Sequence, residues 1–169
     1  FDNSGNDALD LMTTNALVTG SVFRKSGDKG ISVGESSHLF GVDNILVDNQ
    51  IGVQSKDRST AILFNQSFEN NKTALHAYKK NWQYGTGGTI FLAKSIVSGG
   101  EVASAQKQSQ IHLFDSFVGG PLGGKRVSFV DTDSEAGWDA TSDQYLPDNG
   151  PVSAILAQRV ERVAKEQPA

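Results

Sequence analysis

The stretch Gly30-Ile31-Ser32-Val33-Gly34-Glu35-Ser36-Ser37 has a counterpart 22 residues later in Gly52-Val53-Gln54-Ser55-Lys56-Asp57-Arg58-Ser59. The same register continues to Ala8-Leu9-Asp10-Leu11 before it and to Ala74-Leu75-His76-Ala77 after it. A period of this length is typical of solenoid proteins, in which each unit stacks on the next. Four successive units therefore predict one stacked repeat fold.

Within each unit, apolar residues alternate with polar or small ones, as they do in half-buried β-strands. The alternating residues are Leu9 and Leu11, Ile31 and Val33, Ile51 and Val53, and Leu75 and Ala77. Shorter apolar runs follow after polar corners, at 16–18, 39–40 and 61–64 and again at 22–23, 45–46 and 68. Strands that repeat at fixed offsets without helices between them stack as parallel sheets. The repeat therefore predicts an all-β, single-stranded parallel β-helix with coils of about 22 residues.

The corners between the strands are rich in residues that form turns. Asp48-Asn49 recurs as Asn70-Asn71, and Ser26-Gly27 takes the same place one unit earlier. Gly and Asn adopt a left-handed backbone at low cost, and stacked Asn side chains can form hydrogen-bonded ladders. We expect these residues to act in turns.

The regularity is interrupted after Asn81, where residues 82–88 are expected to form an inserted loop. Strand patterns resume at 89–93 and 110–118, and residues 127–130 are the expected last strand. Helical spacing then begins behind Pro151, which is a favourable first-turn residue. The apolar residues of this pattern are Val152, Ile155, Leu156, Val160 and Val163.

We therefore expect two regions. Residues 1–130 form the coils, and residues 131–169 form an acidic loop and a short C-terminal capping helix, amphipathic and packed on the open end or side of the coil. Phe1 enters directly into what reads as the middle of a coil. The coil is thus expected to continue N-terminally in a longer protein, and its uncapped N-terminal end to allow association.

The composition argues against two classes of partner. The formal net charge is −4, and no long basic run is present, whereas nucleic-acid binding depends on clustered Lys and Arg. No apolar stretch approaches the roughly 20 residues that span a bilayer. We expect neither nucleic-acid binding nor membrane insertion. The chain has no cysteine, a count that leaves the cellular compartment open.

The repeat places side chains of the same register about 4.8 Å apart on neighbouring coils. With the alternating apolar residues pointing inward, an outward polar column is expected at Asp10, Ser32, Gln54 and His76. A second column, of small residues, is expected beside it at Ala8, Gly30, Gly52 and Ala74. We expect this column to face outward as a shallow floor, suited to an extended ligand rich in hydroxyl groups.

A charged cluster follows the same strands. Glu35 is expected to stack over Asp57, and Asp57 over Lys79. Lys56 is expected to stack next to Tyr78. Two carboxylates one coil apart could act as the acid and base of glycoside cleavage, or could hold a calcium ion. The alternative is a solvated network of surface charges that contributes little energy. Asp131, Asp133, Glu135 and Asp139 also give a weak match to a calcium loop.

Three segments, Gly5-Asn6-Asp7-Ala8-Leu9-Asp10, residues 18–23 and Ser26-Gly27-Asp28-Lys29-Gly30-Ile31, resemble the pectate-lyase-like right-handed parallel β-helix superfamily. The resemblance covers roughly residues 5–118 and implies a right-handed coil. The sequence is also similar to the polygalacturonase-type glycoside hydrolases. This resemblance implies that Asp7 and Asp28 correspond to catalytic carboxylates, and that Lys29 occupies the position of a further aspartate of that family. The chain also looks like the β-helical regions of large bacterial surface proteins, which implies an extracellular or cell-surface location.

Two functions from different classes follow as expectations. The first is a carbohydrate-active β-helix that binds an extracellular polysaccharide and cleaves it as a lyase or glycosidase, with calcium as a conceivable cofactor. Its candidate catalytic residues are Asp28, Lys29, Glu35, Lys56 and Asp57. Its candidate substrate-binding residues are Asp10, Gln54, His76, Tyr78, Lys79, Trp82 and Tyr84. The second is a non-enzymatic stalk or glycan-binding module, favoured if Trp82 is buried and the groove flat.

Overall fold

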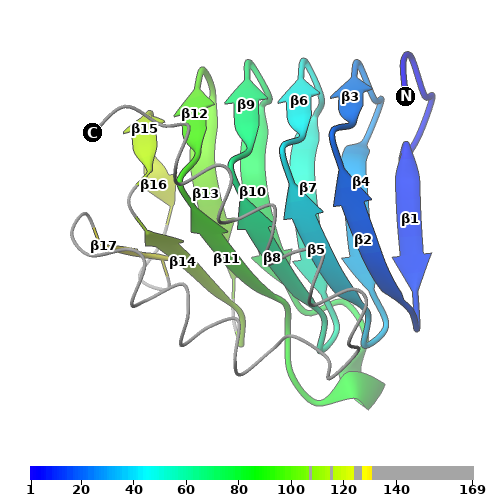
Figure 1. The fold of residues 1–169 in the computed structure, drawn as a ribbon. Helices are drawn as coiled ribbons and strands as arrows, with labels where there is room; N and C mark the ends of the chain where they lie inside the picture. Colours follow the sequence, from blue (N-terminus) through cyan, green and yellow to red (C-terminus); the bar gives the residue numbers. More distant parts are fainter. Residues whose placement is uncertain (107, 115, 124–126, 131–169) are drawn as a thin grey trace.

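The computed structural model describes residues 1–106, 108–114, 116–123 and 127–130 of the 169-residue chain. Over these residues the chain winds as a right-handed parallel β-solenoid of about five turns, each of about 22 residues (Figure 1). Each complete turn contributes one strand to each of three sheets, and neighbouring strands in every sheet are parallel. The predicted fold class is confirmed.

The strands of the three sheets follow one another in strict rotation along the chain. Sheet 1 contains β1 (Leu9–Met12), β4 (Lys29–Gly34), β7 (Ile51–Lys56), β10 (Thr73–Tyr78), β13 (Glu101–Ala105) and β16 (Leu122–Gly123). Sheet 2 contains β2 (Asn15–Thr19), β5 (His38–Val42), β8 (Thr60–Phe64), β11 (Thr89–Ala93), β14 (Gln110–Phe114) and β17 (Val127–Val130). Sheet 3 contains β3 (Val22–Arg24), β6 (Ile45–Val47), β9 (Ser67–Glu69), β12 (Ile96–Ser98) and β15 (Phe117–Gly119).

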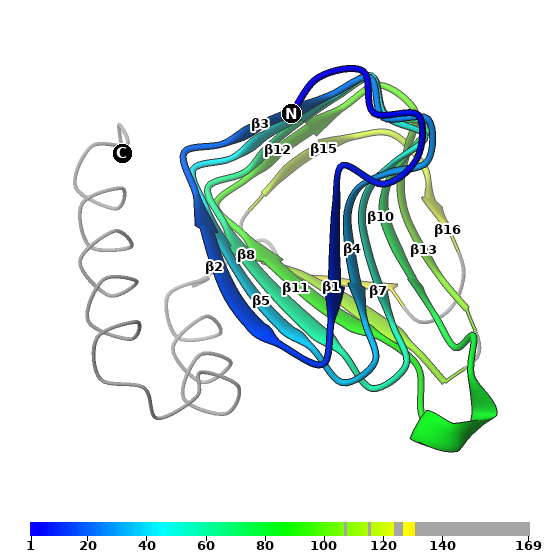
Figure 2. The same cartoon turned by 90° about the vertical axis from the view of Figure 1, so that its right-hand side faces the viewer.

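The core lies inside the coil, enclosed by the three sheets (Figure 2). Ile31 pairs with Leu9 on one side and with Val53 on the other, and Val53 pairs with Leu75, as the repeat predicts. Stacking these inward positions builds one continuous column of apolar side chains. The fully buried members include Ile31, Val33, Leu39, Leu46, Val53, Leu63, Phe68, Leu75, Ile90, Leu92 and Ile111.

Hydrogen bonds between corner residues hold successive turns together. The amide of Ser26 donates to Asn49 Oδ1 at 2.9 Å, and the amide of Asn49 donates to Asn71 Oδ1 at 3.0 Å. The predicted Asn ladder is therefore present, but its first unit is shifted by one residue. Asn49 aligns with Ser26 and not with Gly27, because Lys25 takes the left-handed position (φ 55°) that Asp48 takes one turn later.

The predicted interruption is also present. A single 3-10 turn, η1 (Trp82–Tyr84), lies between β10 and β11 and projects from the coil (Figure 2). The strand pattern then resumes, and β17 corresponds to the expected last strand. The predicted acidic loop and helix of residues 131–169 lie outside the described residues. No helix in the described part of the chain is long and apolar enough to span a membrane.

Candidate functional site

The outer face of sheet 1 carries a column of polar side chains in register, as predicted. Asp10 pairs with Ser32, Ser32 with Gln54, and Gln54 with His76, while Ser104 extends the column by one strand. These residues alternate with core residues such as Ile31 and Leu75, so their side chains point away from the interior. We call Asp10, Ser32, Gln54, His76 and Ser104 the polar ladder.

The centre of the polar ladder is recessed and incompletely hydrogen-bonded. Ser32 is 0% exposed and Gln54 is 2% exposed, whereas Asp10 is exposed and His76 is half-buried. Gln54 Oε1 and His76 Nδ1 are 2.8 Å apart. Ser32 Oγ and Gln54 Nε2 have no hydrogen-bond partner in the described chain. Two polar groups on this face are thus buried without a hydrogen-bond partner, which is unusual in folded proteins.

His76 is held in its neutral form by its surroundings. Burial lowers the pKa of His76; the charge of Glu101 acts against this shift, and the charge of Lys29 adds to it. Its ring stacks on Tyr78, with centroids 5.0 Å apart. Burial in turn raises the pKa of Tyr78, although the charge of Lys29 acts in the opposite sense. At neutral pH, His76 is therefore a neutral hydrogen-bonding group.

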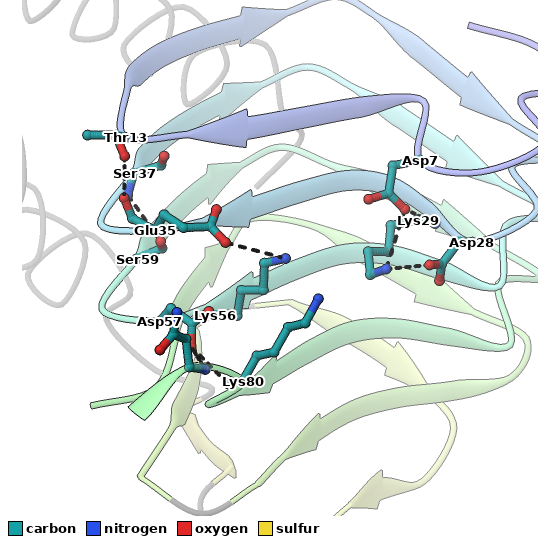
Figure 3. Close-up of polar contacts among 11 residues, drawn as sticks. Asp7, Thr13, Asp28, Lys29, Glu35, Ser37, Lys56, Asp57, Ser59 and Lys80 are labelled. Atoms are coloured by element: carbon teal, nitrogen blue, oxygen red, sulfur yellow. Dashed lines mark hydrogen bonds and ion pairs between the residues drawn. The ribbon is translucent and has the colours of Figure 1, made fainter. Parts of the chain in front are cut away.

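One end of this face carries a lysine between two aspartates (Figure 3). Lys29 Nζ lies 3.4 Å from Asp7 Oδ1 and also forms an ion pair with the carboxylate of Asp28. Burial acts to lower the pKa of Lys29, but the hydrogen bond to Asp28 and the charges of Asp7 and Asp28 outweigh it and raise the pKa. Lys29 is thus a permanent cation and a poor general base.

The other end of the face carries the pair formed by Lys56 and Glu35. Lys56 Nζ lies 3.9 Å from Glu35 Oε1, and Lys56 is in register with Tyr78, as predicted. The lysine side chain lies against Gly34, where an added Cβ would stand only 2.5 Å from Lys56 Cε. Gly34 therefore leaves the space in which Lys56 is buried to 8% exposure.

Asp57 is committed to the backbone of the inserted loop. Its Oδ1 accepts hydrogen bonds from the amides of Lys80 at 2.8 Å and Asn81 at 2.7 Å (Figure 3). Asp57 is 0% exposed and has a left-handed backbone, with φ 52°. Two amide donors on consecutive residues fix the position of this carboxylate oxygen against the backbone. The geometry supports a positioning role for Asp57 more directly than a catalytic one.

The inserted loop presents an aromatic ring beside this end of sheet 1. Trp82 is 79% exposed, whereas Tyr84 is half-buried. Arg58 Nε donates to the carbonyl of Tyr84 at 3.0 Å, and Lys79 Nζ donates to the carbonyl of Gly85 at 3.2 Å. Both cations therefore stabilise the loop. The exposed face of Trp82 is available for stacking on a ligand.

The column of small residues faces the interior, so the predicted outward floor is wrong. A Cβ added to Gly30 would meet Leu46, and one added to Gly52 would meet Phe68, both of them core side chains. Ala74 is 1% exposed and belongs to the core cluster. The chain bends where sheet 3 passes into sheet 1, so that strict alternation fails there and consecutive residues both point inward.

Two features of this face were not foreseen. Ser104 was missed because the inserted loop lengthens its turn, so that Ser104 follows His76 by more than 22 residues. The role of Gly34 as the cradle of Lys56 was also missed, although the 22-residue register already places the two residues one turn apart.

The described residues contain no group of three or more His, Asp or Glu side chains arranged to hold a metal ion. The weak calcium-loop pattern of residues 131–139 lies outside them. Comparison with known proteins adds no assignment: no family model, curated protein or solved structure matches the chain. What the arrangement offers chemically is a row of hydrogen-bonding groups that is neutral apart from Asp10 and recessed at Ser32 and Gln54, with a paired lysine at each end of the strands and an exposed indole beside it.

Proposed function

We propose that this chain is a polysaccharide-binding β-solenoid that holds an extended glycan on the outer face of sheet 1. The proposal includes membership in the pectate-lyase-like superfamily and an extracellular or cell-surface location in a bacterium, as the sequence resemblance implies. The ligand contacts are assigned to the polar ladder, with Trp82 stacking on a sugar ring.

The unpaired polar groups of the ladder carry this proposal. A buried donor or acceptor without a partner costs about 1–3 kcal/mol. Ser32 Oγ and Gln54 Nε2 are two such groups, side by side on neighbouring strands. Because both atoms are buried, a ligand would reach them only if the side chains around them shifted on binding. A sugar hydroxyl both donates and accepts, so one ring could then satisfy both groups at once. Binding would then offset the free-energy cost of leaving these two groups unpaired in the free protein.

The size of the face suits an extended ligand. From β1 to β13 the ladder crosses four strand-to-strand steps of about 4.8 Å, or about 19 Å in all. Lys29 and Lys56 flank the ladder at the two ends of the strands, and each is already paired with a carboxylate. The face therefore combines little net charge with many hydrogen-bonding groups, which favours hydroxyl groups over a polyanion.

Affinity electrophoresis over a panel of neutral and acidic polysaccharides tests this function. We expect at least one polysaccharide to retard the protein, and Gln54→Ala to weaken that binding about five- to tenfold, since a hydrogen bond contributes about 1 kcal/mol. Gln50→Ala is the matched control, because Gln50 is exposed at a corner outside this face. Absence of retardation on every polysaccharide, or equal retardation of the two variants, would count against the proposal.

One observation favours a second function, cleavage by a lyase mechanism. The lowered pKa of His76 leaves it able to accept a proton at neutral pH, and the cation Lys29 could offset the charge of a uronate carboxylate. The test is the release of unsaturated uronate from acidic polysaccharides, with and without chelator. Activity that His76→Ala abolishes would support a lyase, and no product from any polysaccharide would leave binding alone.

A further inference from the structure

A hollow of about 260 Å³ lies at the corner where sheet 2 passes into sheet 3 (Figure 2). In each turn this corner is two residues long, as it is between β8 and β9. Three successive turns contribute to the hollow. Its lining residues are Asp43, Asn44, Ile45, Asn65, Gln66, Ser67, Lys94 and Ile96. None of them belongs to the polar ladder, so the hollow is separate from the face of sheet 1.

A short side chain on the middle strand opens the hollow. Ser67 pairs with Ile45 on one side and with Ile96 on the other. Both isoleucines are exposed, at 44% and 56%. With strands about 4.8 Å apart, the two isoleucines stand about 10 Å from each other, and only a serine lies between them. A methyl group or a flat amide of a ligand can occupy the place that a larger side chain would fill.

The buried corner residue Gln66 departs from the hydrogen-bonding pattern of its neighbours. Asn44 Oδ1 accepts from the amide of Ser21 one turn earlier at 2.9 Å, and Ser95 Oγ accepts from the amide of Gln66 at 2.9 Å. Gln66 Nε2 instead donates to the carbonyl of Phe64 in its own turn at 3.0 Å. Gln66 is 2% exposed, and its Oε1 has no hydrogen-bond partner among the described residues. A residue that lines the hollow thus holds a buried acceptor that lacks a donor.

The lining residues favour a neutral, polar ligand that carries one apolar group. Six of the eight are polar, and they include one acid, Asp43, and one base, Lys94. Asp43 Oδ1 accepts a hydrogen bond from Asn65 Nδ2 at 2.8 Å. A purely apolar ligand would bury these groups without replacing their hydrogen bonds to water, and a charged ligand would meet a charge of its own sign.

We propose that the hollow binds the N-acetyl group of an amino sugar. The methyl group lies between Ile45 and Ile96, and the acetamido N–H donates to Gln66 Oε1. Because this oxygen is shielded from solvent, the contact forms when the exposed side chain of Ile96 turns aside, a rotamer change that takes picoseconds to nanoseconds. A hexose without the acetyl group offers neither the methyl group nor the amide N–H.

Saturation-transfer difference NMR of the full chain, with N-acetylglucosamine as the probe, tests the proposal. We expect the transfer to be strongest at the acetyl methyl protons and to persist in a large excess of glucose. Gln54→Ala changes the polar ladder and should leave this transfer intact, so that failure at the hollow and failure at sheet 1 are distinguishable. Absence of transfer to the methyl protons, or its loss in excess glucose or in Gln54→Ala, would overturn the proposal.

Two pairs of variants locate the acetyl group. Ser67→Phe fills the hollow and should reduce the transfer about fivefold or more, whereas Ser98→Phe, at an exposed serine of β12 outside the hollow, should not change it. Ile96→Ser removes one wall at an exposed position and should reduce the transfer about threefold. Val22→Ser is its control, because Val22 is exposed on the same face but does not line the hollow. Equal transfer within either pair would contradict the assignment.

Discussion

Gly52 lies where the chain turns from sheet 3 into sheet 1, and its missing side chain leaves room for Phe68. A Cβ there would stand 2.9 Å from the Phe68 ring and 2.6 Å from the carbonyl oxygen of Ala74. We expect Gly52→Ala to lower the free energy of unfolding by about 1–3 kcal/mol, as overpacked cores do, measured by urea denaturation.

Gly5→Ala is the matched control, since no atom lies within 4 Å of its added Cβ. Its free energy of unfolding should stay within about 0.5 kcal/mol of the parent. If Gly52→Ala were as harmless as Gly5→Ala, the inward orientation of the small-residue column would be contradicted.

His76 makes the stability of the fold depend on pH. Its pKa is lowered in the folded state, so below the unfolded value of about 6.5 the unfolded chain binds more protons than the folded one. The free energy of unfolding should therefore fall as the pH is reduced from about 7.5 to about 5.5. His76→Asn should reduce this fall in urea denaturation, and His112, whose pKa burial also lowers, should account for part of the remainder. An equal fall in the variant would contradict this account.

At the level of single residues, the sequence predicted orientation well within strands and poorly at corners. Alternation placed Ile31 inward and Ser32 outward correctly, because backbone pleating alone determines it. It failed at Gly30, where the chain bends. The amide bonds made by Asp57 were also beyond prediction, since they depend on the path of the loop, which the repeat does not specify.

The inserted loop between β10 and β11 depends on the carboxylate that anchors its first residues. Asp57→Ala removes the acceptor of two backbone amides and should lower the free energy of unfolding by about 1–3 kcal/mol. Asp57→Asn keeps an oxygen acceptor and should be milder. Urea denaturation and limited proteolysis after Lys79 and Lys80 would measure the two effects.

Glu69→Ala is the control for this series, because Glu69 is an exposed carboxylate on β9. It should change the free energy of unfolding by less than about 0.5 kcal/mol. A loop equally resistant to protease in Asp57→Ala and in the parent would show that the carboxylate does not position it.

At the level of elements, the repeat predicted nearly every strand, because each turn reuses the same apolar pattern. It also located the loop, as the place where the pattern breaks. The number of strands per turn followed from the polar corners, whose Ser and Asn side chains accept hydrogen bonds from backbone amides of the preceding turn. The shift at Lys25 escaped prediction because the spacing of one corner differs from the others by a single residue.

For the whole molecule, the three sheets give the coil three different surfaces. Sheet 1 presents the polar ladder, sheet 2 carries an apolar cluster separate from the main core that includes Phe40 and Ile62, and sheet 3 exposes two pairs of apolar side chains in register. Val22 pairs with Ile45 and Ile96 pairs with Phe117, and Ser67 lies in register between the two pairs. A solenoid stacks identical positions, so one residue choice per turn becomes a continuous stripe along the axis. Function can thus be assigned to one face at a time.

The central claim is that the ladder on sheet 1 holds a glycan, and an NMR titration tests it most directly. The full chain would be titrated with an oligosaccharide of whichever polysaccharide retards it. We predict that the largest shifts occur at the Gln54 side-chain amide, the His76 ring and the amide of Ser32, with smaller shifts at the Trp82 indole. Shifts confined to sheet 3 or to the inserted loop, with Gln54 and His76 unchanged at saturation, would contradict the claim.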